Sequence, residues 1–458
     1  MNLLAINWAN VGLQAGQLLL ALSILIVLHE FGHYITARWF KCRVEKFFLF
    51  FDPWFALVKK KVGDTVYGIG WLPLGGYVKI SGMIDESMDK EAMKEPAKEW
   101  EFRSKPAWQR LIIMLGGIIM NVLVAFAIYA FVLMIWGERH IPIKSARNGM
   151  WITDSLMYEL GFRNGDKVIT VNGDSLKYFE EIQPKVLIGG RKVLVEREGK
   201  NMELDLPVSL IGKLVKRKDK RRQLITVRVP AIVGAYEEKD TAFGKKAGLK
   251  EFDRIFEVND RPVIFMDDIN TILANYKSNF VNLKVQRGID TITLVSKVTS
   301  NGRIGINGLS GKQYDSIGIY TITTKKYGFF PAFPAGIRKT GEKLTDYIDQ
   351  FKLILDPETE AYKAVGGFKA IGSVFPTEWD WESFWNITAF LSIILAFMNL
   401  LPIPALDGGH VMFTLYEMIT RRKPNEKFLE YAQMVGMVLL LLLMLYANGN
   451  DWFGWGKG

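Results

Sequence analysis

The sequence predicts a multi-pass α-helical membrane protein that also carries two folded α/β domains outside the bilayer. Three observations support this fold class: 49% hydrophobic residues combined with 23% charged residues, four long apolar segments, and a repeated stretch in the middle of the chain. A chain of 458 residues with this composition is too apolar for an ordinary soluble protein and too charged to lie wholly in a membrane.

The first membrane span must extend beyond its uninterrupted apolar run. Leu18 to Leu28 provides eleven uncharged residues, whereas a helix needs about 20 to cross about 30 Å of hydrocarbon. The span must therefore include the following segment, His29-Glu30-Phe31-Gly32-His33, which places ionisable side chains at a depth where they are costly and usually functional. No Lys or Arg precedes Arg38, so we expect this span to be retained and not cleaved as a signal peptide.

His29 and His33 have the spacing of two ligands to one metal ion. Residues i and i+4 differ by about 40° around a helix, so both imidazoles can bind the same Zn²⁺. Glu30 then lies on the side where a metal-activated water is expected, and we predict that it is the general base of a peptide hydrolysis.

Three further spans are predicted: Leu111 to Trp136, Phe384 to about Ile419 with prolines inside it, and Tyr431 to Ala447. Asn121 is the only strongly polar residue of the second span. Because ionisable and polar groups inside a membrane usually face other protein groups, we expect Asn121 to face the helix bundle.

Basic residues beside the spans predict the orientation of the chain. They place the loops after the first span, before the second, and between the third and fourth on the cytoplasmic side. Both termini and the region from about Glu138 to Glu382 are then extracytoplasmic. The net charge of +10 mostly reflects the basic residues that flank the spans, and it indicates no nucleic-acid partner. The flanking residues are Arg38, Lys41, Arg43, Lys46, Arg103, Lys105, Arg110, Arg421, Arg422, Lys423 and Lys427.

The region between the second and third spans contains an internal repeat. Leu160 to Gly173 realigns on Ala247 to Asp260, 87 residues later. Each copy reads as a helix end, a turn, a strand and an Asn-led hairpin, which resembles the PDZ domain. Such domains add a peptide strand to an open sheet edge, and the alternative is that they act as spacers or size filters. The second copy has Phe252 and Asp260 where the first has Gly165 and Gly173, which leaves its turn geometry and its competence to bind a ligand open.

A second motif lies far downstream, at Asn399-Leu-Leu-Pro-Ile-Pro-Ala-Leu-Asp407-Gly-Gly-His410. Together with the histidine motif in a membrane span, it resembles the site-2 protease family of intramembrane zinc metalloproteases, in particular the PDZ-bearing regulator-of-sigma-E protease type. The resemblance implies that Asp407 is the third zinc ligand and that Asn399 binds the substrate backbone or the oxyanion. His410 reads as a neighbouring or packing residue, because a fourth protein ligand would displace the water.

Residues 68 to 82 resemble the membrane-reentrant β-hairpin of the same family. The resemblance implies that its edge holds the substrate in extended form, and we assign Gly75, Gly76 and Tyr77 to substrate binding. A transmembrane substrate must unwind locally, and its freed backbone groups then need partners in a dry site. Upstream, Leu49 to Asp52 departs from the glycine-rich turn of many relatives.

The implied function is that of a zinc metalloendopeptidase in the bacterial cytoplasmic (inner) membrane. It is expected to cut a single-pass membrane protein, such as an anti-sigma factor or a signal-peptide remnant, after a site-1 protease has removed the outer domain. One alternative is a catalytically silent membrane scaffold or sensor with PDZ domains. A soluble-type metalloprotease with a membrane anchor would need another downstream ligand, which His140 alone does not provide. Cys42 is the only cysteine, so no intrachain disulfide is expected.

The predicted organisation has eight parts. Residues 301–383 are expected to contain an amphipathic helix marked by Ile337, Leu344, Ile348, Phe351 and Leu355, which lies on the outer membrane face or packs against the PDZ-like domains. The parts are 1–40 (first span with the histidine motif), 41–110 (reentrant hairpin and cytoplasmic loop), 111–137 (second span), 138–225 and 226–300 (PDZ-like domains), 301–383 (linker), 384–420 (third span with the Asp407 motif) and 421–458 (cytoplasmic loop, fourth span and tail).

Overall fold

The computed structural model describes residues 8–73, 75–83, 96–215, 223–237 and 241–455. The chain divides into two compact units. The helical unit comprises Met1–Gly137, Lys326–Leu355 and Tyr362–Gly458, and the α/β unit comprises Glu138–Lys325 and Asp356–Ala361.

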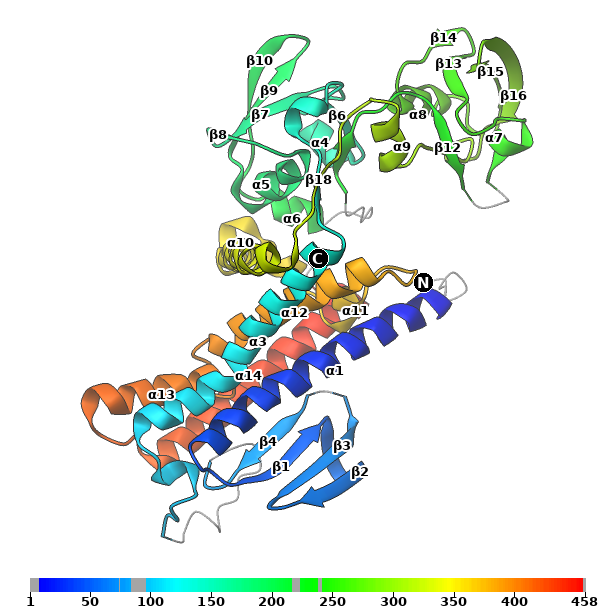
Figure 1. The fold of residues 1–458 in the computed structure, drawn as a ribbon. Helices are drawn as coiled ribbons and strands as arrows, with labels where there is room; N and C mark the ends of the chain where they lie inside the picture. The colour runs from blue at the N-terminus through cyan, green and yellow to red at the C-terminus, as the bar shows by residue number, and fades with distance from the viewer. Residues whose placement is uncertain (1–7, 74, 84–95, 216–222, 238–240, 456–458) are drawn as a thin grey trace. The chain divides into compact units, whose positions relative to one another are not determined.

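Among the described residues, four helices are long and apolar enough to cross a membrane. They are α1 (Trp8–Trp39), α3 (Ala107–Ile135), α12 (Trp381–Leu400) and α14 (Glu426–Phe453). At about 1.5 Å per residue each of them spans about 30 Å or more. The four predicted spans are therefore present, and Figure 1 shows their helices within the helical unit.

The third predicted span, written as 384–420, is two helices. α12 ends at Leu400 and α13 (Asp407–Thr420) begins after a short irregular segment. Pro402 and Pro404 lie in that segment and cannot donate the backbone hydrogen bonds that would continue α12. The break places Asp407 at the start of a new helix.

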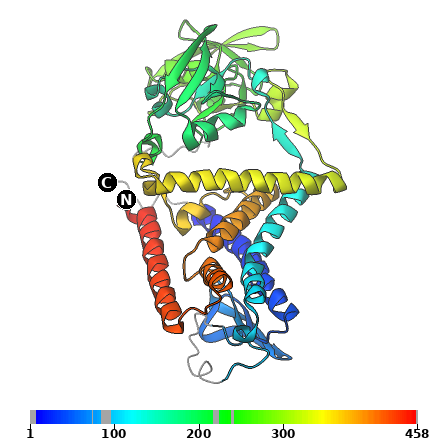
Figure 2. The same cartoon turned by 90° about the vertical axis from the view of Figure 1, so that its left-hand side faces the viewer.

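α3 is the centre of the helical unit, and α1, α10, α12 and α13 all pack against it. α10 (Phe329–Leu355) contains the predicted amphipathic segment and crosses α3 (Figure 2). Its Leu344 packs beside Tyr129 of α3, and its Phe351 ring lies 5.2 Å from that of Phe397 on α12. Part of its apolar surface therefore faces these two helices.

A four-stranded sheet follows α1. Its strands are β1 (Val44–Leu49), β2 (Phe51–Val62), β3 (Thr65–Leu72) and β4 (Tyr77–Ile80), in the order β2-β3-β1-β4. β1 pairs with β3 in parallel and with β4 in antiparallel orientation. Residues 68–82 were expected to form one hairpin, but β1 lies between β3 and β4, so that pairing was wrong; Leu74 of this segment lies outside the described residues.

The α/β unit contains two modules with matching sheets. The first sheet has the order β10-β9-β7-β8 and the second β14-β13-β15-β16 (Figure 1). In the first, the strands are β7 (Lys167–Val171), β8 (Asp174–Ser175), β9 (Lys192–Arg197) and β10 (Lys200–Asp205). In the second, they are β13 (Arg254–Val258), β14 (Arg261–Pro262), β15 (Phe280–Arg287) and β16 (Asp290–Lys297).

Shorter elements complete both modules. Three two-stranded pairs are β6 (Met150–Ile152) with β11 (Ile225–Val227), β12 (Val233–Tyr236) with β17 (Ile306–Gly308), and β5 (Glu138–His140) with β18 (Thr323–Lys325). The helices are α4 (Ser155–Glu159), α5 (Ile182–Gly189), α6 (Leu210–Val215), α7 (Phe243–Lys246), α8 (Met266–Leu273) and α9 (Gly311–Ser316). In the helical unit, α11 (Phe368–Gly372) precedes α12.

The sequence repeat corresponds to a repeated ion pair. In the first module the Arg197 guanidinium donates to both carboxylate oxygens of Asp166, at 2.7 and 2.8 Å. In the second, Arg287 donates to both oxygens of Asp253, at 2.8 and 2.7 Å. Both aspartates are almost fully buried, so each turn is fixed by a bidentate pair.

The two turns of the second copy keep the geometry of the first. Gly165 and Gly173 have φ of +91° and +88°, and the matching Phe252 and Asp260 have φ of +67° and +60°. Non-glycine residues adopt this left-handed region at a cost. The surrounding contacts, among them the hydrogen bond from the Phe252 backbone N–H to the Val233 carbonyl (2.8 Å), hold the turn in place.

Candidate active site

Three side chains that are far apart in the sequence converge in the helical unit. His29 and His33 lie one turn apart on α1, and Asp407 is the first residue of α13. The Nε2 atoms of His29 and His33 are 3.4 Å apart, and Oδ2 of Asp407 lies 3.3 Å from the first and 3.2 Å from the second. Among the described residues, these three side chains form a group whose ligand atoms are close enough together to hold one metal ion.

The spacing of these atoms fits a zinc ion. In a tetrahedral site with Zn–N and Zn–O distances of about 2.0–2.1 Å, neighbouring ligand atoms lie about 3.3–3.4 Å apart. The three observed separations of 3.2–3.4 Å match the edges of such a tetrahedron. Three protein ligands also leave the fourth position open, as a catalytic site requires.

The hydrogen bonding of His33 leaves the correct nitrogen for a metal. Nδ1 of His33 lies 2.9 Å from the Ile113 carbonyl of α3. A carbonyl oxygen only accepts hydrogen bonds, so Nδ1 carries the proton and the lone pair is on Nε2. His33 is therefore held in the tautomer that presents Nε2 to Asp407 and to a metal.

Asp407 does not cap its own helix. It is the first residue of α13, and the cap residue Leu406 offers no side-chain hydrogen bond to the helix. The carboxylate faces the two histidines instead, with its side chain 20% exposed. Gly408 and Gly409 lie against the backbone of Leu400 to Pro404, where a β-carbon has no room. The two glycines thus allow the start of α13 to approach the end of α12.

Gly117 of α3 gives the histidine rings their space. A β-carbon at this position would overlap Nε2 of His33, and it would lie 2.5 Å from Cε1 of His29. Gly117 therefore makes room for the two rings, in addition to the close helix packing that small residues allow.

The candidate ligands open into a cavity of about 1030 Å³ between the helices and the sheet. All eight residues assigned from the sequence line it: His29, Glu30, His33, Gly75, Gly76, Tyr77, Asn399 and Asp407. Gly76 lies against Glu30, because a β-carbon on it would be 3.4 Å from Cγ of Glu30. The amide nitrogen of Asn399 lies 3.4 Å from Nε2 of His29.

β4 is an edge strand on this cavity. It pairs with β1 on one side only, and all four of its residues line the cavity. An edge strand presents backbone N–H and C=O groups that a further strand can pair with. The phenolic oxygen of Tyr77 donates to Asp52 (2.8 Å) and accepts from Lys46 (3.4 Å), and these three side chains bring polar groups into the cavity.

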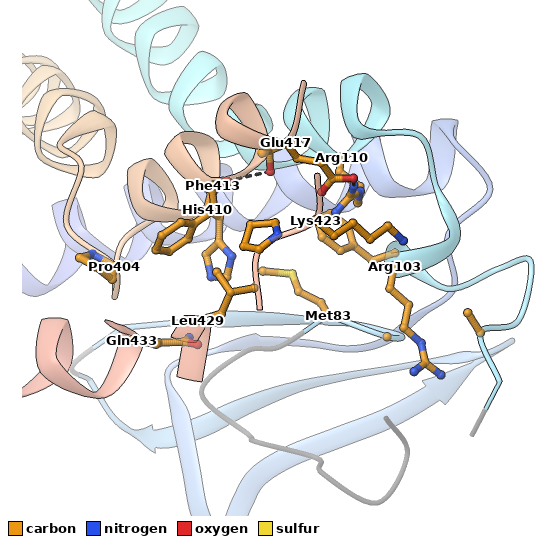
Figure 3. Close-up of a pocket in the computed structure, with 15 residues that line it drawn as sticks. Met83, Arg103, Arg110, Pro404, His410, Phe413, Glu417, Lys423, Leu429 and Gln433 are labelled. Atoms are coloured by element: carbon orange, nitrogen blue, oxygen red, sulfur yellow. Dashed lines mark hydrogen bonds and ion pairs between the residues drawn. The ribbon is translucent and has the colours of Figure 1, made fainter. Parts of the chain in front are cut away.

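A second pocket of about 340 Å³ adjoins the cavity and shares Met83, His410 and Gln433 with it (Figure 3). Arg110 and Glu417 form an ion pair across it at 2.5 Å. His410 lies on α13, three residues after Asp407, and lines both spaces. This placement fits the expectation that His410 is a neighbour of the site and not a metal ligand.

Asn121 is the site residue that the sequence analysis left without a role. It is fully buried on α3, and its amide lies 3.1 Å from Nδ1 of His29. The sequence shows Asn121 as a single strongly polar residue in an apolar span, which does not indicate its partner.

Comparison with known proteins adds independent information. The model of peptidase family M50 matches residues 17–443. The chain is 26% identical over 462 residues to the regulator of sigma-E protease RseP of Escherichia coli, covering 94% of this chain and 97% of the relative. It is 27% identical over 451 residues to the metalloprotease MmpA of Caulobacter vibrioides, covering 95% and 94%. A protein of Campylobacter jejuni that bears the name of a zinc metalloprotease is 27% identical over 441 residues, covering 94% and 91%.

Proposed function

The chain belongs to peptidase family M50 and is a zinc metalloprotease of the membrane, and on this premise we propose that it cuts the transmembrane segment of single-pass membrane proteins. The substrates in this proposal resemble anti-sigma factors or signal-peptide remnants, and they are cut after a first extracytoplasmic cleavage. The name of RseP, a regulator of sigma-E protease, supports a regulatory substrate. The observation that carries the proposal is the convergence of His29, His33 and Asp407 beside Glu30 in one cavity among membrane helices.

In this proposal His29, His33 and Asp407 hold the zinc ion. When bound, the ion polarises the scissile carbonyl and lowers the pKa of a coordinated water. Glu30 is the general base: its carboxylate accepts the proton of the attacking water and returns a proton to the leaving amine. The amide of Asn399, beside His29, donates a hydrogen bond to the carbonyl oxygen as negative charge develops on it.

The substrate strand binds along β4. A transmembrane helix satisfies its own backbone hydrogen bonds, so a protease must unwind it and replace those bonds in a site with little water. The free edge of β4 supplies backbone partners, and Gly75, Gly76 and Tyr77 lead into it beside Glu30. This arrangement favours an extended substrate whose scissile bond lies next to the candidate metal ligands.

The two modules of the α/β unit are PDZ-like domains on the extracytoplasmic side in this proposal. The loops rich in Lys and Arg beside the spans support a cytoplasmic location for the β1–β4 sheet, with both termini on the opposite side. The modules then stand where a substrate with an intact outer domain approaches. We favour a size filter over a specific peptide-binding role.

A comparison of cells that express the wild-type chain or Glu30→Gln tests the function. Membrane-embedded fragments of single-pass proteins are expected to accumulate only with the Glu30→Gln variant, and membrane proteomics will identify them. Equal fragment levels in the two strains would contradict the proposal. Cells that lack the protein serve as the control, and they should accumulate the same fragments.

A further inference from the structure

The environment of His29 differs from that of His33 in one respect. His33 donates from Nδ1 to a carbonyl oxygen, whereas Nδ1 of His29 faces the nitrogen end of the Asn121 amide at 3.1 Å. The oxygen end, Oδ1 of Asn121, is buried and has no hydrogen-bond partner among the described residues. Burying an acceptor without a partner is unfavourable.

The direction of this amide decides whether His29 can bind a metal through Nε2. If the amide nitrogen donates to Nδ1, a neutral imidazole carries its proton on Nε2, which points at Asp407 and His33. That proton occupies the position of the metal. If Oδ1 faces His29 instead, Nδ1 is the donor and Nε2 keeps its lone pair.

The two ends of an amide have nearly the same shape, so a half-turn of the Asn121 side chain exchanges them. The half-turn gives Oδ1 a donor in the Nδ1–H group of His29 and moves the amide nitrogen to the place where Oδ1 had no partner, so the tautomer of His29 decides between the two directions; the half-turn gives His29 the same tautomer as His33. We propose that Asn121 is a positioning residue that accepts a hydrogen bond from Nδ1 of His29 and thereby presents Nε2 to zinc. This inference rests on the proposed assignment of His29 as a zinc ligand.

The placement of Asn121 on α3 fits this role. Ile113, Gly117 and Asn121 follow one another at intervals of four residues and so lie along one face of α3. The first supplies the acceptor for His33, the second leaves room for both rings, and the third supplies the acceptor for His29. One face of α3 therefore orients both histidines of α1.

The hydroxyl of Ser392 fixes the backbone of Asn121. It donates to the Asn121 carbonyl at 2.7 Å from the neighbouring helix α12, and it is fully buried. This hydrogen bond holds α3 and α12 together at the site without involving the amide. Ser392→Ala therefore provides a matched control for changes of local packing.

The test measures the zinc affinity of the full-length protein in detergent, by competition with a chelator. Groups that orient a metal ligand typically change metal affinity 10–100-fold when they are removed. We expect Asn121→Leu, which keeps the size but lacks an acceptor, to lose about 10–100-fold in zinc affinity. Asn121→Asp, which retains an acceptor, should stay within a few-fold of the wild type, and Ser392→Ala should be unchanged.

Two outcomes would overturn the inference. If Asn121→Asp loses as much zinc affinity as Asn121→Leu, the amide acts as a donor. If Asn121→Leu binds zinc as the wild type does, the amide has no role in orienting His29. If Asp407→Ala also binds zinc as the wild type does, the zinc site itself is misassigned.

A spectroscopic measurement covers the case in which Asn121→Leu does not fold. The chain has only four histidines, so ¹⁵N-histidine labelling of the zinc-loaded wild type and of Asn121→Asp gives few signals. Both proteins are expected to show His29 protonated at Nδ1, assigned by comparison with a His29 variant. Protonation of His29 at Nε2 in the wild type would contradict the inference without reference to activity.

Discussion

Gly32 of α1 and Gly116 of α3 face each other where the two helices cross, and neither position has room for a β-carbon. A β-carbon on Gly116 would lie 2.6 Å from the Gly32 carbonyl oxygen, and one on Gly32 would lie 2.7 Å from the Gly116 carbonyl carbon. Since His33 follows Gly32 directly and Gly117 follows Gly116, this crossing sets the distance from α3 to the candidate metal ligands.

Gly116→Ala is expected to push α1 and α3 apart. Overpacking of a tight interior typically costs about 1–3 kcal/mol, and the shift should also lower zinc affinity because Ile113 and Asn121 move away from the histidines. Thermal unfolding in detergent and chelator competition measure the two effects. Gly16→Ala on α1, where nothing lies within 4 Å of the added carbon, should change neither.

Glu30→Gln should keep zinc and lose cleavage. Glutamine has nearly the size of glutamate but cannot accept the proton of the attacking water, and general-base catalysis typically contributes 10²–10⁴-fold. Metal analysis of the purified protein and turnover of a single-pass membrane substrate separate the two roles. Near-normal turnover would remove Glu30 from the mechanism, and loss of zinc would make it a ligand.

Asp407→Ala should lower zinc occupancy, because two histidines lack the charge and the third donor of a stable catalytic site. Asp407→Asn keeps an oxygen donor without the charge and should give an intermediate affinity. Metal analysis after dialysis checks both variants. Full zinc occupancy in Asp407→Ala would mean that the third ligand lies elsewhere.

The sequence motifs indicated the residues that meet in the site, because these residues carry polar or ionisable side chains in otherwise apolar segments. Charged and imidazole groups in apolar spans stand out, as do the two prolines before Asp407. The sequence did not indicate how these groups are supported. Ile113 contributes a backbone carbonyl, which any residue has. The contact of Asn121 with His29 depends on how α1 and α3 cross, and no local sequence pattern encodes that crossing.

The sheet illustrates the same difference between local and long-range information. The resemblance to a family hairpin indicated strands between residues 68 and 82, and the end of β3 and the whole of β4 are found there. The insertion of β1 between them depends on a parallel pairing with residues before the turn, and nearest-neighbour reasoning favours a hairpin. In the repeat, the sequence left the turns at Phe252 and Asp260 open, and the structure shows both residues in the left-handed region that glycine favours.

The second module should lose stability in acid through Asp253. Burial alone would raise the pKa of Asp253, but the hydrogen bonds from Arg287 and the Lys250 backbone outweigh it and hold the pKa below the ordinary 3.8. The folded-state pKa is thus lower than the unfolded one. The stabilisation is therefore complete above about pH 4 and is lost as the pH falls through the folded-state value. Hydrogen exchange of β13 and β15 in the full chain between pH 3 and 6 measures this loss.

Arg287→Ala should weaken the same module at neutral pH. Removing the partly exposed Arg287 leaves the almost fully buried Asp253 carboxylate without its bidentate partner, which is destabilising. Hydrogen exchange of β13 and β15 should therefore be faster at pH 7, and less dependent on acid. Lys284→Ala is the control, because Lys284 lies on the same strand as Arg287 but forms a partly exposed pair with Glu257 of β13, and its removal should have little effect on exchange.

Deletion of about residues 146 to 298 tests the role of the two modules. If they form a size filter, the deletion variant should cut substrates whose outer domain is still attached. If they bind the substrate, the variant should cut trimmed substrates more slowly. Continued rejection of the full-length substrate by a variant that cuts the trimmed one would contradict the filter.

The separation of Asp407 from the two histidines has a consequence for biosynthesis. Asp407 is 374 residues from His33, and ribosomes add about 5–20 residues per second. The third proposed ligand is therefore made roughly 20–75 s after the first two. Throughout that time the nascent chain already exposes His29, Glu30 and His33 to the membrane, yet the proposed zinc site is incomplete. On the proposed assignment of Asp407, the newly made protease stays inactive until almost all of its chain has been translated, and this delay would protect neighbouring membrane proteins during its own insertion.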